Sequence, residues 1–109
     1  MIPRALFGIP LVALGAMSAV AAGGGDPTAQ YGKHLAGECT SCHRLDGAPS
    51  AIPSILGKPE AEFIELLNAY REGRRTNPVM VSVAKSLDGE QMAALAAYFG
   101  TLPKPDDAP

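Results

Sequence analysis

Apolar residues recur three and four positions apart in two stretches of the chain, as they do along the buried face of an α-helix. The stretches consist of Phe63, Ile64, Leu67 and Tyr70, and of Met92, Leu95, Ala96 and Phe99. No segment alternates apolar and polar residues in the manner of a half-buried strand. The pattern therefore predicts an all-α fold of three to four helices.

Capping and helix-breaking residues set the expected ends of these two helices. The first begins at Pro59 and ends at Gly73, a residue suited to a helix C-cap. The second has Asp88 as its N-cap, with Gln91 three residues later completing a capping box, and stops at Gly100. Both helices are thus bounded by local sequence signals.

Another helix is expected over residues 27–37, because Asp26 is a good N-cap and Pro27 suits the first helical position. Gly32 lies in the middle of this helix, where glycine is unfavourable. Two explanations are open at this point. Either another helix passes close to Gly32, or the glycine is merely tolerated.

The N-terminal segment has the features of a secretory signal peptide, which we expect to span residues 1–22. A short positive start precedes an apolar run over 5–20, and small residues follow at the positions that a signal peptidase reads. Cleavage after Ala21 or Ala22 would leave one small domain, residues 23–109. An uncleaved membrane anchor is the alternative, although the run is barely long enough to span a bilayer and contains a proline.

Charge and export narrow the possible partners. Without Arg4, the chain keeps eight basic and eleven acidic residues, a formal charge of −3. This charge, and the lack of a basic patch with interleaved aromatic residues, argue against nucleic-acid binding. Export implies a periplasmic location, with no stable membrane insertion after cleavage.

The segment Cys39-Thr40-Ser41-Cys42-His43 has the C-x-x-C-H spacing of covalent haem attachment. Two thiols on one helical turn reach the two vinyl groups at one porphyrin edge, and the imidazole that follows becomes an axial iron ligand. A thioredoxin-like pair would need a βαβ pattern, and a disulfide across so small a loop would stabilise little. A structural zinc site would need a second pair of ligands. The motif predicts one covalent haem c, bound through Cys39 and Cys42, with His43 as ligand.

A low-spin electron-transfer haem needs a second axial ligand, for which the domain offers His34, Met80 and Met92. His34 lies just before the motif and cannot easily reach the opposite haem face. Met92 is accounted for by a hydrophobic staple at the start of the last helix. Met80 lies in an expected loop, after a proline and before a short helical turn at 81–85. We expect Met80 to be the ligand, with core filling as the alternative.

Other residues are expected around the two ligands. The backbone carbonyl of Pro53 is a candidate acceptor for the second N–H of the haem histidine. Arg74, Arg75 and Asn77 are candidates to hydrogen-bond either a haem propionate or the segment around Met80. A solvated surface patch is the alternative for the two arginines.

These features together resemble a class I cytochrome c over essentially the whole exported domain. Gly32 matches the glycine at which the family's first helix crosses its last. Residues 52–57 resemble the family's proline loop, which implies that the Pro53 carbonyl contacts the haem histidine and that Ile55 packs on the ring. The resemblance implies a small fold of three to four helices around one covalently bound haem.

A closer likeness covers residues 57–80, which are similar to the cytochrome c4 group and to the cytochrome subunit of flavocytochrome c sulfide dehydrogenase. In both, a helix ending near a Tyr/Phe-Arg/Lys-x-Gly-x-Arg run precedes the methionine ligand, which supports Met80. The c4 proteins carry two such domains, so a c4 proper is disfavoured. Arg44 departs from the glycine usual after the histidine and places a charge near the exposed haem edge.

The expected function is single-electron transfer by a free monohaem carrier, with membrane or periplasmic redox proteins as partners. The alternative is a dedicated cytochrome subunit that accepts electrons from the flavin subunit of a flavoprotein oxidoreductase. In neither case is the chain expected to be an enzyme by itself. A haem enzyme or gas sensor would need an open iron position, against which Met80 argues.

Overall fold

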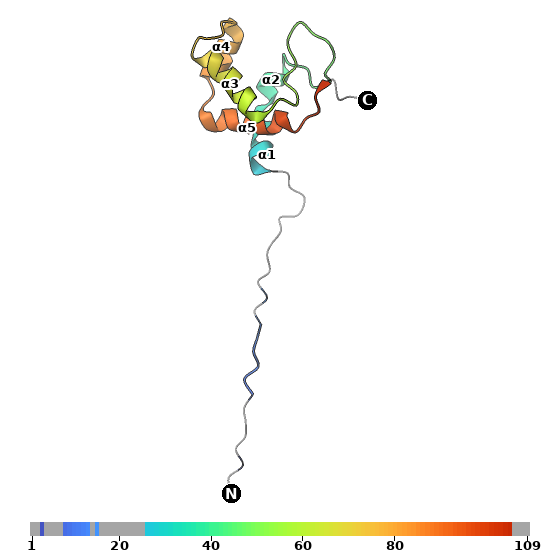
Figure 1. Cartoon of the computed structure of the whole chain (residues 1–109), viewed down its shortest axis with the longest axis vertical. Helices are drawn as coiled ribbons and strands as arrows, with labels where there is room; N and C mark the ends of the chain where they lie inside the picture. Colours follow the sequence, from blue (N-terminus) through green and yellow to red (C-terminus); the bar gives the residue numbers. More distant parts are fainter. Residues whose placement is uncertain (1–2, 4–7, 14, 16–25, 106–109) are drawn as a thin grey trace.

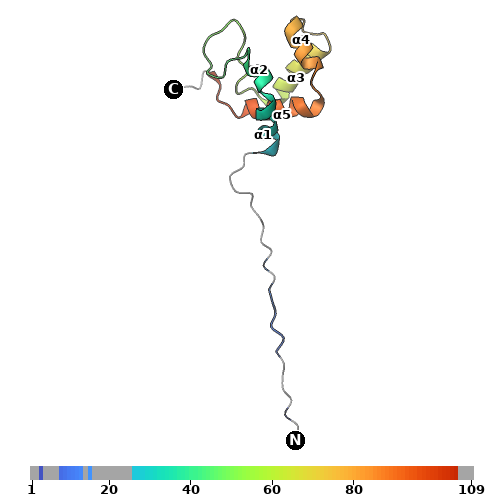
Figure 2. The same cartoon turned by 180° about the vertical axis from the view of Figure 1, so that it is seen from behind.

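The computed structural model describes residues 3, 8–13, 15 and 26–105, and Figures 1 and 2 show the chain from two opposite sides. Within residues 26–105 it contains five α-helices and no strand. They are α1 (Pro27–Leu35), α2 (Gly37–Thr40), α3 (Glu60–Arg71), α4 (Pro78–Lys85) and α5 (Gly89–Gly100). The all-α prediction is confirmed.

Helix α1 begins where the sequence predicts but ends earlier. The Asp26 carboxylate accepts a hydrogen bond from the Thr28 backbone N–H at 3.1 Å, and Pro27 occupies the first helical position. Ala36, which is buried, separates α1 from α2. The single helix expected over residues 27–37 is therefore two helices joined at Ala36, and the second of them carries Cys39.

Helix α1 crosses α5 at Gly32, and this pair makes the most extensive helix–helix contact among the described residues. Gly32 is buried. A Cβ at this position would collide with the carbonyl oxygen of Ala94 and would lie 2.8 Å from the Cβ of Tyr98. Only glycine allows the two backbones to approach this closely. Close passage of another helix is therefore the explanation for this glycine.

Side chains from α3 and α5 form the centre of the core. The rings of Phe63 and Phe99 stack with their centroids 5.6 Å apart, and the ring of Tyr98 lies 5.2 Å from that of Phe99. Met92 and Leu95 on α5 are almost fully buried. Among the described residues, no polar or charged side chain is buried with them. The apolar stripe expected on the last helix thus faces the core.

Helix α3 ends in a Schellman motif at Gly73, whose φ of 78° favours glycine. The Gly73 N–H donates to the carbonyl of Tyr70 at 3.2 Å, and the Arg74 N–H donates to the carbonyl of Ala69 at 2.8 Å. The chain then turns back, and α4 packs against α3. Figure 1 shows the two helices side by side above the N-terminal half of α5.

The expected loop position of Met80 is wrong. Helix α4 begins at Pro78, and Met80 lies in its first turn. The Asn77 side chain caps this helix, because its oxygen accepts hydrogen bonds from the N–H groups of Val79 and Met80 at 3.1 and 3.2 Å. Met80 is therefore held by a regular helix rather than by a free loop.

The long loop between α2 and α3 is held against the C-terminal end of α5. The Gly57 N–H donates to the carbonyl of Phe99 at 2.9 Å. The φ of Gly57 is 67°, and a Cβ there would lie 2.8 Å from the backbone nitrogen of Lys104. Because Pro53 belongs to this loop and His43 begins it, the contact with α5 also limits where these two residues lie.

Much of the predicted signal peptide falls outside the described residues. The part that is described, residues 3, 8–13 and 15, forms no helix or strand, and the side chains of Ile9 and Leu11 are 88% and 94% exposed. These apolar side chains therefore add nothing to the core. No helix in the described part of the chain is long and apolar enough to cross a bilayer.

We expect Gly32→Ala to lower the free energy of unfolding by at least about 1–3 kcal/mol, because the added methyl group must push α1 away from the α5 backbone. Gly37→Ala is the matched control, since a Cβ at Gly37 meets nothing within 4 Å. Denaturant unfolding of the two haem-containing variants gives the comparison. Equal stability of the variants would contradict the close crossing.

Candidate functional site

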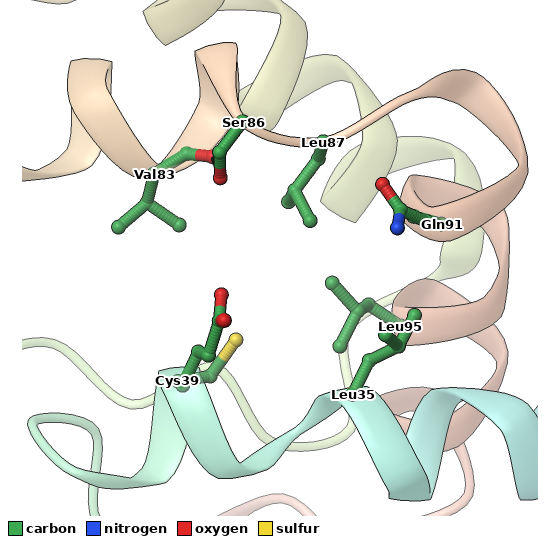
Figure 3. Close-up of a pocket in the computed structure, with 8 residues that line it drawn as sticks. Leu35, Cys39, Val83, Ser86, Leu87, Gln91 and Leu95 are labelled. Atoms are coloured by element: carbon green, nitrogen blue, oxygen red, sulfur yellow. Dashed lines mark hydrogen bonds between the residues drawn. The ribbon is translucent and has the colours of Figure 1, made fainter.

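A cavity of about 140 Å³ lies between the α1–α2 segment, α4 and α5 (Figure 3). Its lining combines apolar and polar side chains and consists of Leu35, Glu38, Cys39, Val83, Ser86, Leu87, Gln91 and Leu95. Figure 3 shows the sulfur of Cys39 pointing into this space, with Val83 on the opposite side. The first cysteine of the C-x-x-C-H motif therefore faces a cleft with apolar side chains on several of its walls, against which a porphyrin can pack.

The two cysteines of the motif have different surroundings. Burial, and to a smaller extent the negative charge of Glu38, raise the pKa of the free Cys39 thiol to about 11. Cys42 is exposed. One sulfur thus faces the interior and the other the surface. This arrangement fits a flat ring that enters the cleft with one edge near solvent.

His43 is oriented by the loop that follows it. Its Nδ1 lies 2.7 Å from the carbonyl oxygen of Pro53. A carbonyl oxygen can only accept a hydrogen bond, so Nδ1 carries a proton, and in the neutral imidazole Nε2 is then the nitrogen with the free lone pair. The hydrogen bond expected from the sequence is therefore present, and it holds the imidazole in the tautomer that a metal ligand requires.

Met80 lies on the side of α4 that borders the cavity. Val83, which lines the cavity, follows Met80 by three residues, and such pairs share one face of a helix. Both side chains are partly buried and pack against the core, as does Ile55. The structure therefore brings α4, with its methionine, and Cys39 to opposite sides of one cleft.

The other two candidate ligands lie elsewhere. His34 is exposed on α1. Met92 is 1% exposed and belongs to the core cluster between the helices. Neither lines the cavity that Cys39 faces, and His43 and Met80 are not among its lining residues either.

The polar residues before α4 have protein partners. The Arg74 guanidinium forms ion pairs with Glu65 at 2.7 Å and with Glu72 at 2.9 Å. Arg75 lies over the ring of Tyr70, 5.0 Å from its centroid. Asn77 was a candidate to hydrogen-bond either a haem propionate or the segment around Met80. Its side chain caps α4 and so bonds to the segment around Met80.

The structure adds information on two charged residues beside the motif, Arg44 and Glu38. Arg44 forms a two-bond ion pair with Asp46, at 3.0 and 2.6 Å, and its hydrogen bond is the main cause of an Asp46 pKa lowered to about 2. The charge of Arg44 is therefore compensated locally. Glu38, which lines the cavity, was not singled out from the sequence, and its only signal there is its place next to Cys39.

Comparison with protein families agrees with this geometry. The model of the family described as "Cytochrome c" matches residues 29–103. The chain belongs to the cytochrome c family. It is an electron-transfer protein that carries one haem c, attached covalently through Cys39 and Cys42.

Several bacterial cytochromes are similar to this chain. The cytochrome subunit of sulfide dehydrogenase from Chlorobaculum tepidum is 43% identical over 79 residues, which are 71% of either chain. The thiosulfate dehydrogenase electron acceptor of Stutzerimonas stutzeri is 34% identical over 79% of this chain, which spans only 38% of that protein. Cytochrome c-553 of Helicobacter pylori is 38% identical over 64% of this chain and 76% of its own length. The first two are named for roles with a dehydrogenase, and the third is named as a cytochrome.

We expect Asn77→Ala to cost about 1 kcal/mol of stability, because the first turn of α4 loses its cap. Asn77→Asp keeps an acceptor oxygen at this position and serves as the control. Thermal unfolding of the haem-containing proteins measures the loss, and hydrogen exchange of the α4 amides shows where it occurs. An unchanged exchange rate in Asn77→Ala would show that the cap contributes nothing.

Proposed function

We propose that His43 and Met80 are the two axial ligands of the haem iron. The observation that carries this proposal is the hydrogen bond from His43 Nδ1 to Pro53, which leaves Nε2 for the metal. The place of Met80 on the cavity side of α4 supports the second ligand. In this proposal the Pro53 carbonyl orients His43, and Ile55 packs against the haem ring.

This ligand pair suits electron transfer. The bound haem supplies a one-electron couple between ferric and ferrous iron. A methionine ligand raises the reduction potential relative to two histidines. The Pro53 carbonyl fixes the histidine and a capped helix carries the methionine, so both side chains keep their positions in the two oxidation states. Little reorganisation then accompanies each transfer.

We also propose that residues 1–22 are a cleaved signal peptide and that residues 23–109 work in the periplasm. The exposed apolar side chains of Ile9 and Leu11 support a segment that is not part of the fold. In this compartment the domain would exchange single electrons with membrane or periplasmic redox proteins as a free carrier.

Met80→Ala tests the ligand assignment. The weak sulfur-to-iron band near the red end of the ferric spectrum should disappear and the reduction potential should fall, because the iron loses a donor that favours its reduced state. Met92→Ala is the control, since it removes a core methionine at a cost of about 2–5 kcal/mol but should keep the band. If the band and potential persist in Met80→Ala, Met80 is not the ligand.

A second function is favoured by one comparison. The relative from Chlorobaculum tepidum is named as a cytochrome subunit of sulfide dehydrogenase. The aligned region covers the same share of that protein and of this chain. In this proposal the chain accepts electrons from a flavoprotein subunit within a stable complex. The Arg44 charge does not distinguish the two functions, because Asp46 pairs with it.

Native purification from the periplasm of the source organism separates these functions. A single haem-containing species of domain size would support the free carrier. A larger complex with both haem and flavin absorption would support the subunit. The mass of the purified chain also tests cleavage, because removal of the first 21 or 22 residues gives one of two defined masses, and an intact chain would contradict cleavage and favour a membrane anchor.

A further inference from the structure

We propose that Glu38 tunes the haem, because its carboxylate lines the cleft that Cys39 faces and holds the reduction potential below the value that a neutral side chain would give. This inference rests on the proposed electron-transfer function. It assigns a role to a residue outside the C-x-x-C-H motif. The role is electrostatic and needs no contact with the iron.

Glu38 is the one charged side chain among the residues that line this cavity. Two other lining residues are polar, and the side chains of both hydrogen-bond to backbone groups three residues away in the sequence. The Ser86 hydroxyl donates to the carbonyl of Val83 at 2.6 Å, and the Gln91 side-chain oxygen accepts from the Asp88 N–H at 2.9 Å. None of the ion pairs within the described residues involves Glu38. The cavity therefore contains one negative charge without a cationic partner.

The charge of Glu38 acts at the attachment point. It adds to the effect of burial in raising the pKa of the free Cys39 thiol. The Cys39 sulfur joins the ring edge, so a charge felt at this sulfur is also close to the porphyrin. A negative charge stabilises the oxidised state, which carries one more positive charge than the reduced state. Lys33, Lys85 and Glu90, on the helices around the cavity, are exposed, as Glu38 itself is, but unlike Glu38 they do not line the cavity.

Glu38→Gln tests the proposal, because it removes the charge and keeps the shape. We expect the reduction equilibrium to shift about twofold to tenfold toward the ferrous form, the upper value corresponding to about 59 mV for one electron. The measurement is a spectroelectrochemical titration of the haem-containing protein at low ionic strength. Since Glu38 is partly solvated, added salt should reduce the shift.

Two further variants make the result specific. Glu38→Asp keeps the charge and should restore a potential close to that of the unchanged protein. Glu60→Gln removes one charge at the exposed start of α3, outside the cavity, and should shift the potential less. No shift in Glu38→Gln, or an equal shift in Glu60→Gln, would overturn the proposal.

The same spectra separate this proposal from the ligand assignment. If Met80 is the ligand, the sulfur-to-iron band should be present in the unchanged protein and in all three variants. A missing band in the unchanged protein would overturn the Met80 assignment. The difference in potential between Glu38→Gln and the unchanged protein would still decide the role of Glu38.

Discussion

The close contact between the backbones of α1 and α5 at Gly32 is the constraint on which the rest of this structure depends. Helix α1 leads through the buried Ala36 directly into the short helix that carries Cys39. Helix α5 supplies Leu95 to the wall of the cavity that Cys39 faces. The place where the two backbones cross therefore sets the distance between the covalent attachment point and the apolar wall of the cleft.

Two separate sets of backbone and side-chain contacts hold the two sides of the proposed iron site. On one side, the loop with Pro53 orients His43 and is fixed to the end of α5 through Gly57. On the other side, a turn at Gly73 and a cap at Asn77 place the helix with Met80. The contacts of Gly73 and Asn77 join residues close in the sequence, whereas the hydrogen bond from Gly57 to Phe99 joins distant parts of the chain. The site therefore depends both on local structures and on the packing of the loop against α5.

Much of the fold could be predicted because its signals are local. Asp88 and Gln91 form the expected capping box, with hydrogen bonds of 2.8 and 2.9 Å. The start of α4 could have been predicted in the same way as that of α1. Asn77-Pro78 repeats the cap-then-proline signal of Asp26-Pro27, although Met80 was expected to lie in a loop.

Other features depend on tertiary structure and could not be predicted. The composition of the helix around Gly32 is compatible with either tolerance or a crossing; the family resemblance implied the crossing, and the position of α5 shows it. The pairing of Arg44 with Asp46 depends on how the loop folds back on itself. The place of Glu38 at the cavity depends on where α4 and α5 lie, so neighbouring residues in the sequence say nothing about it.

Among the helices of the described residues, α4 contacts only α3. Helix α4 is thus peripheral in the fold, whereas α1 and α5 pack closely against each other. A segment attached in this way can open as a small cooperative unit without global unfolding. An external ligand that competes with Met80 for the iron would then need to overcome only the free energy of this partial opening. How easily the proposed sulfur–iron bond is displaced would then depend on the packing of α4 against α3. It would not depend on the crossing of α1 and α5 that holds the cysteines.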